Sequence, residues 1–185
     1  RDLRMSRGLG DVYKRQAYDR GETIRATTSF LMADSTTPDG DYIKPQTNPT
    51  NTDCWNGKAY TPLNQLTPGR TKYGTNNNAR IFRYADVLLM NAEAKIKNGK
   101  NGDAPFNEVR RRAKMPELTN VTFQQVIDER RMELMCEWGE RYNDLVRTGL
   151  AKTELKGWSE DKALLPLPFN QYTQIPDLLK EPKDE

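Results

Sequence analysis

Residues 126–149 constrain the fold most, because this segment threads many charged residues through an apolar helical pattern. Apolar side chains recur there at steps of four and seven, which places them on one face of an α-helix. The members of this apolar face are Phe123, Ile127, Leu134, Trp138 and Leu145. Charged residues lie within or beside the same face, where an unpaired charge would cost on the order of several kcal/mol. The sequence therefore predicts ion pairs between this helix and its neighbours.

We expect these charges to form a structural ion-pair network, because guanidinium groups are suited to bidentate pairing with carboxylates. The expected members are Glu129, Arg130, Arg131, Glu133, Glu137, Arg141, Asp144 and Arg147, with Arg110 and Arg112 from an earlier helix. Two other interpretations stay open. Glutamates on one helical ridge could serve as the carboxylate pair of a retaining glycosidase. The run of three arginines at 110–112 is also typical of a phosphate or nucleic-acid patch.

Composition excludes several kinds of chemistry. The 185 residues contain no histidine, which rules out Ser-His-Asp and Cys-His catalysis and every His-ligated zinc site. Cys54 and Cys136 have no CxxC spacing, so we expect neither a metal nor a redox site and favour a buried thiol at Cys136 over a disulfide. Asp34, Asp39 and Asp41 do not match an EF-hand loop, and a plain turn is favoured over calcium binding. No cofactor is expected.

The formal charge of +3 lies entirely in residues 1–16, which hold five basic and two acidic residues (5 − 2 = +3). The rest of the chain has 24 basic and 24 acidic residues and is neutral, so we expect no nucleic-acid partner. Residues 1–16 have little periodicity and are expected to be a non-native or disordered leader. No apolar run approaches the roughly 18–20 residues that a membrane span requires.

The chain changes character near residue 79. Residues 17–78 form a loop-rich segment with turn signals from Pro, Gly, Asn and Asp, in which residues 23–32 have the β-branched and apolar content of one extended stretch. Residues 79–185 form a helical region. Its first helix, over residues 80–97, has an apolar stripe and an i,i+4 pair of Glu93 with Lys97, and Asn98-Gly99 ends it. The stripe consists of Ile81, Ala85, Leu88, Ala92 and Ile96.

Two further helices are expected. Asp103 can cap the second, which has Pro105 in its first turn, a Glu108–Arg112 pair, and one apolar face formed by Phe106, Val109 and Ala113. Thr122 can cap the third, which should run to about Arg147 before Gly149 ends it.

Several motifs occur in the order typical of one known family. They are FRYADVLLMNAEA at 82–94, Glu129-Arg130-Arg131 with Glu133-Leu134, Gly139, Arg141, Asp144-Leu145 and Arg147, and a closing Leu165-Pro166-Leu167-Pro168. This set resembles the C-terminal portion of the SusD/RagB family. The resemblance implies a mainly α, SusD-like fold, with tetratricopeptide-like helix pairs and long irregular loops. Gln171 departs from the pattern, because an acidic residue often follows the prolines in the family.

The resemblance also implies a function. Members of this family are non-enzymatic lipoproteins, exposed at the surface of the cell outer membrane. They bind an oligosaccharide and pass it to a SusC-like TonB-dependent transporter. Membrane contact is expected only through a lipid anchor that is missing from this chain.

Sugar binding uses aromatic faces to cover the apolar side of a pyranose, and polar groups to bond its hydroxyls. The loop-rich segment supplies both kinds of group, and we expect ligand binding at Tyr42, Trp55, Asn56, Tyr60 and Tyr73. A glycoside hydrolase remains an alternative, and so does a helical-repeat scaffold for protein interactions. The scaffold would show a period of about 34 residues, which the sequence lacks.

Overall fold

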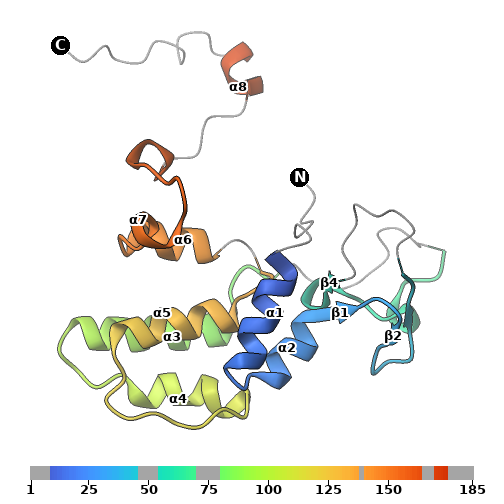
Figure 1. Ribbon diagram of the computed structural model, residues 1–185, viewed down its shortest axis with the longest axis horizontal. Helices are drawn as coiled ribbons and strands as arrows, with labels where there is room; N and C mark the ends of the chain where they lie inside the picture. The colour runs from blue at the N-terminus through green and yellow to red at the C-terminus, as the bar shows by residue number, and fades with distance from the viewer. Residues whose placement is uncertain (1–8, 46–53, 70–79, 138–139, 164–168, 175–185) are drawn as a thin grey trace. The chain divides into compact units, whose positions relative to one another are not determined.

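The computed structural model describes residues 9–45, 54–69, 80–137, 140–163 and 169–174 (Figure 1). Helices dominate the described residues, as expected, and the strands are short. The chain forms two compact units, residues 1–141 and 142–185. The first unit therefore joins the loop-rich segment to the helices that follow it.

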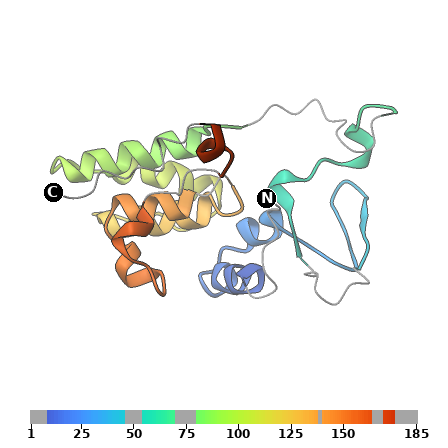
Figure 2. The same ribbon diagram turned by 90° about the horizontal axis from the view of Figure 1, so that it is seen from above.

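Five helices belong to the first unit: α1 (Leu9–Asp19), α2 (Thr23–Ser29), α3 (Tyr84–Lys97), α4 (Asp103–Arg112) and α5 (Phe123–Glu133). Helix α3 packs against both α4 and α5, and Figures 1 and 2 show these three helices side by side. Helix α1 covers part of the segment expected to be a disordered leader. Gln16 of α1 accepts a 2.5 Å hydrogen bond from Arg131, and residues 1–8 lie outside the described residues.

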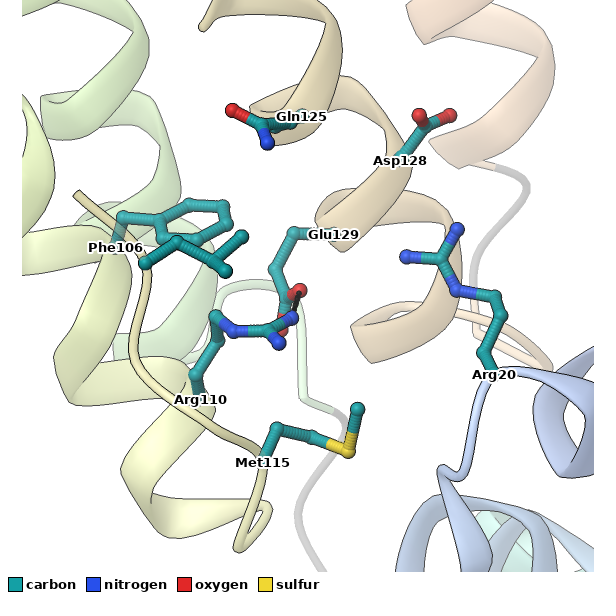
Figure 3. Close-up of a pocket in the computed structure, with 8 residues that line it drawn as sticks. Arg20, Phe106, Arg110, Met115, Gln125, Asp128 and Glu129 are labelled. Atoms are coloured by element: carbon teal, nitrogen blue, oxygen red, sulfur yellow. Dashed lines mark hydrogen bonds and ion pairs between the residues drawn. The ribbon is translucent and has the colours of Figure 1, made fainter. Parts of the chain in front are cut away.

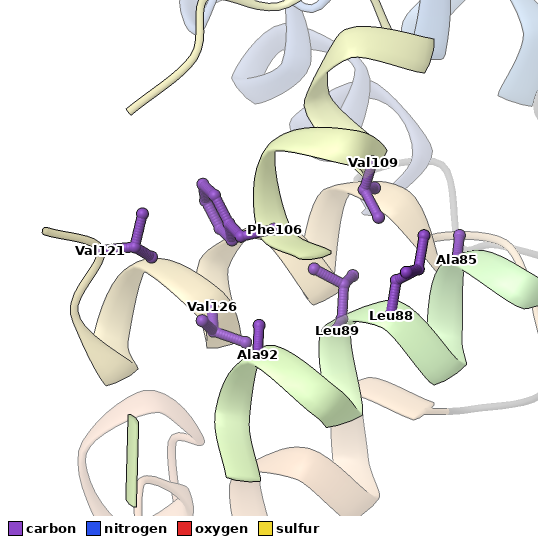
Figure 4. Packing of buried hydrophobic residues seen from close by; sticks show 8 residues of the cluster. All are labelled: Ala85, Leu88, Leu89, Ala92, Phe106, Val109, Val121 and Val126. Atoms are coloured by element: carbon purple, nitrogen blue, oxygen red, sulfur yellow. The ribbon is translucent and has the colours of Figure 1, made fainter. Parts of the chain in front are cut away.

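The main core lies between α3, α4 and α5 (Figure 4). Leu89 and Ala92 of α3 and Val126 of α5 are fully buried, and Phe106 is 1% exposed. Small alanines on α3 let the neighbouring helices approach closely. The cluster consists of Ala85, Leu88, Leu89, Ala92, Phe106, Val109, Val121 and Val126, with Ile96 and Leu118 packed against it.

The apolar stripe predicted for the first helix is confirmed from Ala85 to Ile96. The prediction was wrong for Ile81, the first member of the stripe. Ile81 is 73% exposed, because α3 begins only at Tyr84. The predicted helix end is confirmed. Gly99 has a φ of 67°, and its N–H donates to the carbonyl of Ile96 at 3.0 Å.

The start of α4 differs from the prediction. Gly102 rather than Asp103 is the N-cap residue, and the carboxylate of Asp103 instead accepts 2.9 Å hydrogen bonds from the backbone N–H groups of Asn120 and Val121. Asp103 therefore ties the start of α4 to the loop before α5. The predicted apolar face of Phe106, Val109 and Ala113 is buried, as expected.

The predicted third helix is interrupted. Its start is confirmed, because Thr122 and Gln125 form a reciprocal capping box. Its continuation to Arg147 was wrong: α5 ends at Glu133, and α6 (Glu140–Arg147) is a separate helix. Cys136, between them, has a φ of 65°, which no α-helix accommodates.

Side chains from other elements satisfy the backbone at this break. The carbonyl of Glu133 accepts from Lys58 Nζ at 2.6 Å and from Arg83 Nη2 at 3.0 Å. The carbonyl of Cys136 accepts from Asn56 Nδ2 at 2.7 Å. Positive groups at a helix C-terminus also oppose the negative end of the helix dipole. Tertiary contacts that no local pattern encodes therefore stabilise the end of α5.

The loop-rich segment contains two small antiparallel pairs. Strand β1 (Phe30–Met32) pairs with β4 (Cys54–Asn56), and β2 (Ser35–Thr36) pairs with β3 (Tyr42–Ile43). Two 3-10 turns follow β4: η1 (Gly57–Ala59) and η2 (Leu63–Gln65). The register sets Leu31 opposite Trp55.

The prediction of one extended stretch over residues 23–32 was wrong for its first seven residues, which form α2. The hydroxyls of Thr27 and Thr28 donate to carbonyls four residues earlier, so these β-branched residues are accommodated in a helix. A second apolar cluster then joins α2 to the end of α5: Ala17, Ala26, Phe30, Cys54, Met132 and Met135. Cys136 is half-buried against this cluster, and no disulfide links it to Cys54.

The second unit contains most of α6, then α7 (Ala151–Glu154), η3 (Glu160–Ala163) and α8 (Phe169–Gln174). Gly149, with a φ of 75°, follows α6 as predicted. The proline motif at 165–168 lies outside the described residues. None of the helices in the described ranges has the length and apolarity needed to cross a membrane.

Candidate functional site

Arg25 is the centre of the charged network. Its guanidinium donates to Glu129 at 2.5 Å, to Glu22 at 2.6 Å and to Glu133 at 2.9 Å. Arg25 is only 4% exposed, and each of the three glutamates is 1% exposed. Glu129 and Glu133 are four residues apart on α5, so their carboxylates project from the same face of the helix. One guanidinium from α2 therefore binds both.

Further guanidinium groups also pair with the two α5 carboxylates, and one of them, Arg83, donates to Glu133 at 3.0 Å. Arg110 donates to Glu129 at 2.8 Å, and Arg112 donates to Glu133 at 2.5 Å. Arg112 thus pairs with α5. The predicted pair of Glu108 with Arg112 was wrong, because no ion pair between these two residues is found among the described residues of α4. We call the group of Glu22, Arg25, Arg110, Arg112, Glu129 and Glu133 the charged lock.

The remaining predicted network residues are distributed over several elements. Arg130 pairs with Asp86 of α3 at 2.5 Å. Arg131 reaches α1, as described above, and Arg141 is half-buried at the end of the first unit. Asp144 and Arg147 pair with each other at 2.5 Å within α6, in the second unit.

Glu137 lies just beyond the end of α5 and has two basic partners. Lys58 Nζ donates to its carboxylate at 2.8 Å and Arg83 Nε at 2.7 Å. Burial alone would raise the pKa of Glu137, but these two hydrogen bonds hold it below its ordinary value. Lys58 comes from η1 and Arg83 precedes α3, so Glu137 joins the loop-rich segment to the helical layer.

The pKa of Arg25 follows from its surroundings. Burial would lower it, but the carboxylates of Glu129, Glu133 and Glu22 raise it above the ordinary value. The charged form of Arg25 is therefore strongly favoured in the folded protein. A retaining glycosidase needs one carboxylate free to attack and the other free to donate a proton. Glu129 and Glu133 are buried and bound to guanidinium groups, so their geometry suits a structural role.

A second cluster of polar and aromatic groups lies in the loop-rich segment, around the β2–β3 hairpin. Tyr60 donates a short hydrogen bond to Asp41, and the backbone N–H of Leu63 donates to the same carboxylate oxygen at 2.8 Å. Tyr42, 52% exposed, donates to Asp34 at 2.7 Å. The pKa of Tyr42 is raised above its ordinary value, mainly by this hydrogen bond and to a smaller extent by burial. We call Asp34, Asp41, Tyr42 and Tyr60 the hairpin cluster; it presents the exposed ring of Tyr42 beside the carboxylate of Asp34.

The other sequence-predicted ligand residues differ in their surroundings. Trp55 is half-buried on β4. The side chain of Asn56 is used within the protein, because it bonds Cys136 and also accepts from the backbone N–H of Lys58 at 2.9 Å. Tyr73 lies outside the described residues.

Sequence reasoning missed three basic residues of the site: Arg25, Lys58 and Arg83. Arg83 lies within the family motif at residues 82–94, and this position could have indicated that it belongs to the site. Arg25 lies in a threonine-rich stretch and Lys58 in a loop, and neither has a local pattern that marks it as buried.

Comparison with known proteins agrees with this architecture. The sequence model of the SusD family matches residues 9–176. SusD-like protein P38 of Formosa agariphila is 33% identical, over 55% of this chain and 24% of that protein. Starch-binding protein SusD of Bacteroides thetaiotaomicron is 38% identical, over 42% of this chain and 14% of that protein. The chain thus spans about a quarter or less of these relatives.

Two solved structures are similar to this chain over most of its length. Surface glycan-binding protein A from Bacteroides uniformis has a TM-score of 0.61 and 26% identity, over 82% of this chain and 36% of that one. Surface glycan-binding protein A from Bacteroides thetaiotaomicron has a TM-score of 0.67 and 28% identity, over 86% of this chain and 38% of that one. The expected resemblance is confirmed, and the chain belongs to the SusD family.

Proposed function

We propose that this protein is a non-enzymatic glycan-binding protein that captures oligosaccharides at the outer cell surface for uptake. The observation that carries the proposal is the structural match to two proteins named as surface glycan-binding proteins, over 82% and 86% of this chain. Membership of the SusD family over residues 9–176 supports it.

The proposed sugar contact is the hairpin cluster. The exposed ring of Tyr42 offers an apolar face to a pyranose, and Asp34, which accepts a hydrogen bond from Tyr42, lies beside it as an acceptor for sugar hydroxyls. Tyr60 and half-buried Trp55 would extend this surface.

Two further residues predicted from the sequence to contact the ligand have different roles in the proposal. Asn56 orients the segment after β4, because its amide is bonded within the chain. Tyr73 stays a predicted sugar contact, and that prediction rests on the sequence alone.

The proposed partner is a SusC-like TonB-dependent transporter, which would receive the bound oligosaccharide. The proposed location is the cell outer membrane, with a lipid anchor as the only membrane contact. Both proposals rest on membership of the SusD family. They concern the whole protein, and this chain spans less than two fifths of the solved structures it matches.

A calorimetric titration series tests the sugar contact. Purified protein is screened against neutral and acidic polysaccharides, and the best binder is titrated into the wild type, Tyr42→Ala and Trp55→Ala. Removal of one stacking ring should weaken binding about tenfold, which corresponds to about 1.4 kcal/mol. Tyr84→Ala is the matched control, because Tyr84 is a 68% exposed tyrosine on α3, outside the hairpin cluster.

The outcomes separate the parts of the proposal. Binding by the wild type and the Tyr84 variant with weakened binding by the Tyr42 variant supports both the function and the site. Unchanged affinity in the Tyr42 and Trp55 variants would move the site elsewhere. Release of reducing sugar from any bound polysaccharide would overturn the non-enzymatic assignment.

A further inference from the structure

A pocket of about 280 Å³ lies between α4, α5 and the turn that joins α1 to α2 (Figure 3). Phe106 lies at one side, Met115 lies at another, and Arg20 faces them from the α1–α2 turn. Leu118 also lines the pocket. None of the aromatic residues of the hairpin cluster lines this pocket. The pocket is therefore a separate candidate site.

The lining of the pocket is electrically balanced. It includes the 2.8 Å ion pair of Arg110 with Glu129, and Glu129 is held a second time by Arg25. Arg20 and Asp128 add one charge of each sign to the lining. The formal charges of the lining sum to zero, which favours a neutral ligand over an anion or a cation.

Hydrogen-bonding groups at the rim have unused capacity. Nε of Arg20 donates to Glu22 at 3.0 Å, and within the described residues no bond is found for its two amino groups. Figure 3 shows this guanidinium directed toward the pocket. Gln125 uses its amide oxygen to accept from Thr122, which leaves its amide N–H groups available. Asp128 accepts from Gln124 through one oxygen at 3.3 Å, and its other oxygen can accept a hydroxyl.

We infer that this pocket binds one neutral sugar ring, as a second glycan contact in addition to the hairpin cluster. The inference rests on the proposed function. A pyranose has an apolar C–H face, which Leu118 and Met115 would cover, and hydroxyls, which Arg20, Gln125 and Asp128 would bond. The volume lies near the lower end of small-molecule pockets, about 300 Å³, so it suits a single ring.

Methyl NMR tests the inference without any substitution at the polar rim. The protein is labelled with ¹³C-methyl methionine, and Met115→Leu assigns the Met115 signal. Glucose, galactose, mannose, xylose and N-acetylglucosamine are then titrated separately to high millimolar concentration. A saturable shift of the Met115 methyl is expected with at least one sugar. Met90, 41% exposed on α3 and outside the pocket, is the control and should not shift.

Variants then separate this inference from the proposed function. Asp128→Ala should weaken the sugar affinity measured from the Met115 methyl shift at least fivefold and leave glycan binding at Tyr42 unchanged. Glu108→Gln, a substitution at an exposed position on α4, should alter neither affinity. No shift of Met115 with any sugar, while polysaccharide binding still depends on Tyr42, would overturn the pocket inference alone. No sugar binding in any assay would overturn the proposed function as well.

Discussion

Replacement of Arg25 by methionine is the most informative test of the charged lock. The substitution keeps the length and apolar stem of the side chain and removes a guanidinium that binds three buried carboxylates. Removal of one partner from a buried ion pair costs about 3–5 kcal/mol, because the remaining charge stays buried. Glu129 and Glu133 keep other guanidinium partners, so we expect the lower part of this range.

Urea unfolding followed by circular dichroism measures this loss. With a slope of about 2 kcal/mol per molar urea, a loss of about 3 kcal/mol lowers the midpoint by about 1.5 M. Arg25→Lys should lose nearly as much, because a single ammonium cannot reproduce the planar fork.

The control is Arg111→Met on α4. Arg111 pairs with Glu117 at 2.9 Å, but the two side chains are 63% and 54% exposed. Exposed pairs contribute about 0–1 kcal/mol, so the midpoint should move by less than about 0.5 M. Equal shifts for the Arg25 and Arg111 variants would refute the claim that the lock holds the fold.

Three further substitutions test other parts of the structure. Leu89→Ala, at a fully buried position, should cost about 2–5 kcal/mol in urea unfolding, whereas Val87→Ala, at a 48% exposed position on the same helix, should cost about 0.5 kcal/mol or less. Gly102→Ala should cost about 1–3 kcal/mol, because its Cβ would lie 2.9 Å from the carbonyl oxygen of Ala92; a neutral result would mean that α3 and α4 can separate there. Two backbone hydrogen bonds hold the pKa of Asp103 below the ordinary 3.8, so its stabilisation is present above that pH and is lost as pH falls through the lowered value. Asp103→Asn should therefore lower the thermal midpoint at pH 7 and have little effect well below pH 3.8, and an equal effect at both would contradict this role.

Local signals in the sequence were enough to predict several elements. The stripe from Ala85 to Ile96, the glycine after α3 and the cap at Thr122 each depend on residues within one or two turns of the helix itself. Such short-range effects can be read from a single sequence.

The break after Glu133 depends on distant residues and was not predicted. Residues 123–147 have a continuous helical pattern, but Lys58 and Arg83 bind the carbonyl of Glu133 where a continuing helix would use its own N–H groups. Arg25 was missed for a similar reason, because it lies 104 residues before Glu129 in the sequence. Long-range pairing decides both features.

The candidate sugar site was only partly predictable. A loop rich in aromatic and polar residues indicated where a contact surface would lie. The sequence did not distinguish Tyr42, whose ring is exposed, from Asn56, whose amide is bonded to Cys136 and Lys58. That distinction depends on which backbone groups the tertiary fold brings beside each side chain.

The central claim is that the charged lock supports the fold while the hairpin cluster binds the glycan. Parallel measurement of glycan affinity and unfolding free energy in Arg112→Gln and Tyr42→Ala tests it most directly. Arg112 is exposed enough for its variant to stay folded, yet it donates to buried Glu133. We predict that Arg112→Gln lowers stability with unchanged affinity, and that Tyr42→Ala lowers affinity about tenfold with unchanged stability. Loss of glycan binding in Arg112→Gln at unchanged stability would contradict the account.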